Sequence, residues 1–75
     1  MSERFDDKII SDFKAKMIRK AKKNGLAENF GKKEIEAMKK KFGYNYYGDI
    51  DEQVNAEIID DLEKWCNNLD TRDLK

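Results

Sequence analysis

Apolar side chains recur every three or four residues along three stretches of this 75-residue chain, and that spacing limits the folds open to it. A side chain returns to the same face of an α-helix every 3.6 residues, so this period indicates amphipathic helices. The alternation of apolar and polar residues that half-buried strands require does not persist anywhere. We therefore predict an all-α fold, a compact three-helix domain.

Residues that cap or stop helices set the expected bounds of the first helix. It should run over about residues 3–23, with Ser2 and Glu3, or alternatively Asp6, capping its start. Asn24-Gly25 should end it, because both residues tolerate the left-handed conformation found at helix ends.

Similar signals bound the other two helices. The second is expected over about residues 32–42 and should end at Gly43. The third is expected over about residues 49–69, where Asp49 and Glu52 have the spacing of a capping box.

The chain has room for one domain, which should cover residues 1–75 and end in a polar tail that frays from about residue 70. A core of this size usually supplies only about 3–5 kcal/mol of stability. A partner or a second copy of the chain could therefore cover part of the apolar surface.

The single cysteine and the charged N-terminus bear on the compartment. Cys66 cannot form an intramolecular disulfide, which fits a reducing environment. Glu3, Arg4 and Lys8 leave no apolar run for a signal peptide. No apolar run reaches the roughly 20 residues of a membrane span. We expect a cytoplasmic protein that does not enter a membrane.

The residue types that support common catalytic chemistry are scarce. The chain has no histidine, the usual proton carrier near neutral pH. One cysteine without histidine can form neither a Cys–His nucleophile pair nor a zinc cluster. No glycine-rich phosphate loop is present. We expect no enzymatic activity, no cofactor and no metal.

Charge is divided unevenly along a chain whose net charge is zero. Residues 14–41 hold eleven basic and three acidic residues, a net charge of +8. Residues 42–75 hold three basic and nine acidic residues, a net charge of −6. This division suggests either two functional surfaces of opposite sign or two solvated surfaces that partly neutralise each other.

The basic residues of the middle segment form two ridges at helical spacing: Lys16, Arg19, Lys20 and Lys23 on the first helix, and Lys32, Lys33, Lys39 and Lys40 on the second. Converging ridges of this kind would contact nucleic-acid phosphates. The alternative is a solvated surface, and lysine outnumbers the arginine that base-reading proteins favour. Nucleic-acid binding is therefore the second hypothesis for this chain.

Three tyrosines stand between two glycines, ahead of the acidic third helix. Tyr44, Tyr46 and Tyr47 could form part of a binding surface, since tyrosine is enriched at interface hot spots. Asp60 and Asp61 would add an acidic face nearby. Alternatively, one or two of the tyrosines pack under the turn and cover the core. We expect at least one to point outward.

Two short sequence segments resemble segments of small helical proteins encoded by phages and prophages. The first is ENFGKKEI, residues 28–35, and the second is WCNN, residues 65–68. This resemblance implies a cytosolic accessory protein made during infection, located in the host cytoplasm. Such proteins commonly bind a host enzyme or serve phage DNA metabolism, but the resemblance assigns no functional residues.

The favoured hypothesis is a small non-catalytic protein that binds a host or phage protein and redirects or inhibits it. The aromatic loop and one charged face would make the contact. Nucleic-acid binding through residues 14–41 is the alternative. A homodimer formed through leftover apolar surface is a third possibility.

Overall fold

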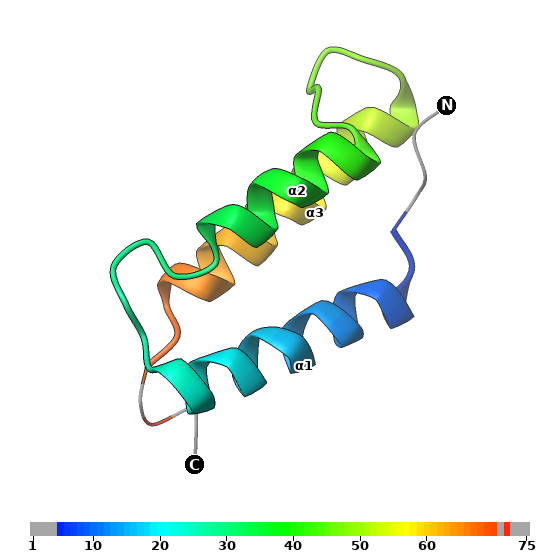
Figure 1. Cartoon of the computed structure of the whole chain (residues 1–75). Helices are drawn as coiled ribbons and strands as arrows, with labels where there is room; N and C mark the ends of the chain where they lie inside the picture. Colours follow the sequence, from blue (N-terminus) through cyan, green and yellow to red (C-terminus); the bar gives the residue numbers. More distant parts are fainter. Residues whose placement is uncertain (1–4, 71, 73–75) are drawn as a thin grey trace.

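The computed structural model describes residues 5–70 and 72, and it confirms the all-α, three-helix fold. Helices α1 (Asp7–Asn24), α2 (Lys32–Phe42) and α3 (Ile50–Asn67) follow one another along the chain. In Figure 1, α2 and α3 lie side by side as an antiparallel hairpin, and α1 runs along them. Most of the tail that was expected to fray lies outside the described residues.

Helix α1 begins four residues later than predicted. Asp6 is the N-cap, with an extended backbone, and its side chain accepts a hydrogen bond of 2.8 Å from the Ile9 amide. Of the alternative caps, Ser2 and Glu3 lie outside the described residues. Phe5 precedes the helix yet is buried, because its ring packs on Phe42 at a centroid distance of 4.2 Å.

Helix α2 has the predicted bounds, whereas α3 is shorter than predicted at both ends. Asp49 caps α3 instead of lying within it, and its carboxylate accepts a 2.8 Å hydrogen bond from the Glu52 amide. Helix α3 ends at Asn67, two residues before the predicted end.

The core contains apolar residues from all three helices. Its buried large members are Phe5, Phe13, Met17, Ile35, Met38, Phe42, Ile59, Leu62 and Cys66. The spacing of apolar residues on α3 predicts a stripe through Val54, Ile58, Leu62, Trp65 and Leu69, with Ile59 and Cys66 alongside. The most buried face instead runs through Asn55, Ile59, Leu62 and Cys66, and shares Leu62 with that stripe. Val54, Ile58, Trp65 and Leu69 are half-buried at its sides.

Asn55 is a fully buried polar residue that connects α3 to the end of α2. Its side-chain amide donates a 2.6 Å hydrogen bond to the carbonyl oxygen of Phe42, the last residue of α2. The last carbonyls of a helix have no partner within the helix. The bond therefore satisfies one of them and fixes where the chain leaves α2.

Candidate partner-binding site

The connection between α2 and α3 exposes two large apolar side chains at one end of the molecule. We call residues 44–50 the tip, which lies at the top of Figure 1. Tyr47 is 97% exposed and Ile50 is 77% exposed, and Tyr46 follows at 42%. Large aliphatic and aromatic side chains exposed within one short segment are typical of binding surfaces.

Short-range hydrogen bonds hold the backbone of the tip. The Tyr47 amide donates a 2.9 Å bond to Asn45 Oδ1, and the Gln53 side-chain amide donates a 2.8 Å bond to the Gly48 carbonyl. Asp49 caps α3 between the two exposed residues. Tyr47 on the turn and Ile50 at the start of α3 are therefore presented on an ordered backbone, so little backbone order has to be gained on binding.

Tyr44 has a structural position distinct from that of Tyr47. It is half-buried, and its hydroxyl donates a hydrogen bond to Asp60 on α3. The hydroxyl oxygens of Tyr44 and Tyr46 lie 3.3 Å apart, with their rings edge to face. The amine of Lys39 lies 4.5 Å from the centroid of the Tyr44 ring. Tyr44 and Asp60 thus connect the tip to α3.

This environment changes the acidity of Tyr44. The hydrogen bond to Asp60, followed by burial and the charges of Asp60 and Glu63, raises the pKa of Tyr44 to about 12. Each of these effects favours the neutral phenol over the phenolate.

We therefore expect a tyrosinate absorbance transition near pH 12 that Tyr44→Phe abolishes. Because the folded pKa is raised, this group's stabilising contribution is complete below the ordinary value of about 10 and is lost as pH rises towards 12. Unfolding by urea at pH 8 and pH 11 should show a smaller pH-dependent loss of stability for Tyr44→Phe than for the unsubstituted chain. An equal loss in both proteins would contradict this role.

The predicted contact residues therefore divide into two groups. Tyr44, Tyr46 and Asp60 are brought together by hydrogen bonds, while Tyr47 points into solvent and Asp61 is exposed on α3. Ile50 was not predicted as a contact residue. No signal in the sequence marked its exposure, because Ile50 lies four residues before Val54, at the spacing of the apolar residues of α3.

The predicted lysine ridges are distributed over more than one face. Lys16, Lys20 and Lys33 line a groove between α1 and α2, whereas Lys32 and Lys39 line a separate cavity between α2 and α3. Arg19, Lys23 and Lys40 are exposed and line neither space.

Ion pairs engage two of these lysines. Lys20 on α1 pairs with Glu34 on α2, and this contact lowers the pKa of the Glu34 carboxyl. Lys39 on α2 approaches Glu63 on α3 at 3.7 Å. Both pairs connect neighbouring helices, so these lysines have structural contacts in addition to any role in binding.

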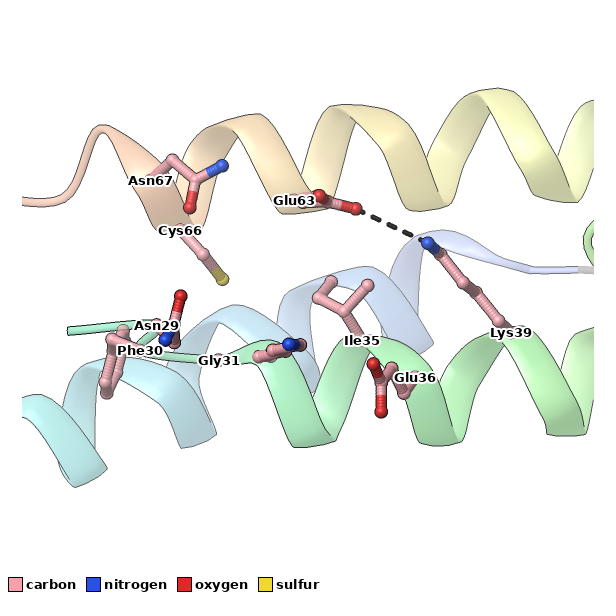
Figure 2. Close-up of a pocket in the computed structure, with 10 residues that line it drawn as sticks. Asn29, Phe30, Gly31, Ile35, Glu36, Lys39, Glu63, Cys66 and Asn67 are labelled. Atoms are coloured by element: carbon pink, nitrogen blue, oxygen red, sulfur yellow. Dashed lines mark ion pairs between the residues drawn. The ribbon is translucent and has the colours of Figure 1, made fainter. Parts of the chain in front are cut away.

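The cavity between α2 and α3, of about 330 Å³, is shown in Figure 2. Lys39 and Glu63 face each other across it, and the Cys66 sulfur points from α3 towards Gly31. Burial, and secondarily the charges of Glu34 and Glu63, raises the pKa of the Cys66 thiol to about 11. Since the thiolate is the reactive form, this cysteine is held in an unreactive state.

Comparison with known protein families, with curated proteins and with solved structures found no match to this chain. None of the helices in residues 5–70 combines the length and the apolar character of a membrane span. Within the described part of the chain, no three cysteine or acidic side chains gather in a way that could hold a metal ion.

Proposed function

We propose that this chain is a non-catalytic protein-binding module that contacts its partner through the tip. One observation carries the proposal: Tyr47, on the turn before α3, and Ile50, the first residue of α3, are 97% and 77% exposed. Burying such side chains is strongly favourable, because each removes a large apolar area from water. Asp49 and Asp51 flank Ile50 with negative charge, which favours a partner surface with a basic rim.

In this proposal the module acts by occupying a surface of a host or phage protein, and so redirects or inhibits it. The resemblance of residues 28–35 and 65–68 to segments of phage and prophage proteins suggests this mode of action. A lone buried thiol fits the reducing host cytoplasm as the place of action.

The test is photo-crosslinking in cells that naturally make the protein. Benzoylphenylalanine in place of Tyr47 should give one discrete crosslinked product. Adding Ile50→Asp should reduce that product at least tenfold, about the effect of removing a hot-spot residue. Ile50 is 77% exposed, so this change should leave the fold intact, which circular dichroism would verify.

The matched control places the same photoreactive residue at Lys23, an exposed site in the last turn of α1. It should give no discrete product. Equal labelling from positions 23 and 47 would contradict a specific role for the tip. A product at twice the chain mass would identify the partner as a second copy.

Nucleic-acid binding is a second candidate, and one observation favours it. Lys16, Lys20, Lys33 and Lys41 all line the groove between α1 and α2. A surface that neutralises phosphates loses affinity steeply as salt rises. That behaviour separates it from a surface that binds by apolar contact.

A further inference from the structure

A groove of about 530 Å³ runs between α1 and α2, on a surface that shares no lining residue with the tip. Apolar side chains from both helices line it, namely Ile9, Phe13, Ala37, Met38 and Phe42. Its volume falls within the range of about 300–1,000 Å³ typical of ligand-binding clefts.

The charges around this groove are predominantly positive. Lys16, Lys20, Lys33 and Lys41 line it together with only two acids, Asp12 and Glu34. Glu34 is neutralised by its ion pair with Lys20. Lys16, Lys33 and Lys41 form no ion pair with any residue in the ranges 5–70 and 72.

We propose that this groove binds an acidic amphipathic helix of a partner protein. The apolar stripe of such a helix would cover Ile9 and Ala37, which are half-buried and exposed, and its flanking carboxylates would meet Lys16, Lys33 and Lys41. Helices that lay an apolar face into a groove in this way form a common recognition mode. Helix α2 has 11 residues and is therefore about 16 Å long, which matches three turns of a bound helix.

Two features favour a protein helix over nucleic acid at this surface. A phosphate backbone would leave the apolar surface of Ile9 and Ala37 uncovered. It would also approach the carboxylate of Asp12, which lines the same groove as the lysines. An acidic helix that also carries an apolar stripe would pair with both the apolar residues and the lysines that line the groove.

Three synthetic peptides of about 16 residues would test the proposal against the full chain by heteronuclear NMR. The first has leucines at helical spacing flanked by glutamates. The second keeps the leucines but carries lysine in place of glutamate. The third keeps the glutamates but carries serine in place of leucine. We expect saturable shifts at Phe13, Ala37 and Met38 with the first peptide only.

Matched charge reversals would then locate the site. Lys33→Glu with Lys41→Glu should weaken binding of the first peptide at least tenfold, since two favourable pairs become repulsive. Lys23→Glu with Lys40→Glu changes the net charge equally but outside the groove, so affinity should change less than threefold. Tyr47→Ala with Ile50→Asp should leave peptide affinity unchanged, which separates this surface from the tip.

Three outcomes would overturn the proposal. Equal binding of the acidic and the basic peptide would remove the role of the lysines. The second outcome is that duplex DNA binds more tightly than the first peptide and loses affinity equally in the two double lysine variants. The basic surface would then be a site for nucleic-acid phosphates. A dimer in sedimentation that Lys33→Glu with Lys41→Glu dissociates would make a second copy the occupant.

Discussion

Gly31→Ala should destabilise the fold by about 2–4 kcal/mol, which is most of the stability expected for a domain of this size. Gly31 precedes α2 with a φ of +84°, in the left-handed region that disfavours a side chain. A methyl group there would also lie 3.1 Å from Cys66 Sγ and 3.2 Å from Met17 Cε. Urea unfolding followed by circular dichroism would measure the loss.

A double-mutant cycle separates the two causes. Cys66→Ala removes the sulfur that the new methyl group would meet, but leaves the backbone conformation at Gly31 unchanged. Gly31→Ala should therefore cost about 1 kcal/mol less in the Cys66→Ala background. If the two substitutions were simply additive, steric conflict with Cys66 would not contribute.

Asn55→Leu should cost about 1–3 kcal/mol, although it places an apolar residue of similar shape in an apolar core. The substitution removes the donor to the Phe42 carbonyl and leaves that buried oxygen without this hydrogen bond. Hydrogen exchange should also quicken at the amides of residues 43–48, because this bond fixes the start of the tip. Urea unfolding and exchange mass spectrometry would measure both effects.

Asn67→Leu is the matched control, since Asn67 is an exposed asparagine on the same helix. Surface substitutions of this kind usually change stability by less than about 0.5 kcal/mol. If the Asn55→Leu variant were as stable as the Asn67→Leu variant, the buried hydrogen bond of Asn55 would contribute no net stability.

Helix periodicity was sufficient to predict the number of helices and the bounds of α2. It was less accurate for α1, because several residues near the N-terminus can cap a helix, and the one that caps α1 is Asp6. On α3, the pattern of apolar residues placed the buried face one position from its true centre. Asn55 caused part of that error, since an asparagine reads as polar and exposed until its hydrogen-bond partner is known.

The candidate surfaces depended more on tertiary contacts. The tyrosine cluster was visible in the sequence, but Tyr44 and Asp60 are 16 residues apart and their hydrogen bond was not. The groove between α1 and α2 also depends on tertiary contacts, because residues from both helices line it. Local spacing predicted two lysine ridges, whereas packing brought Lys16, Lys20, Lys33 and Lys41 together around that groove.

The position of Cys66 has a practical consequence for work on this protein. Cys66 is 5% exposed and its thiol has a pKa of about 11, so maleimide dyes at neutral pH should leave it largely unmodified while the chain is folded. A second cysteine introduced at an exposed position, such as Tyr47, could then be labelled selectively without altering the core. Fluorescence and spin-label measurements on either surface can therefore retain the native Cys66.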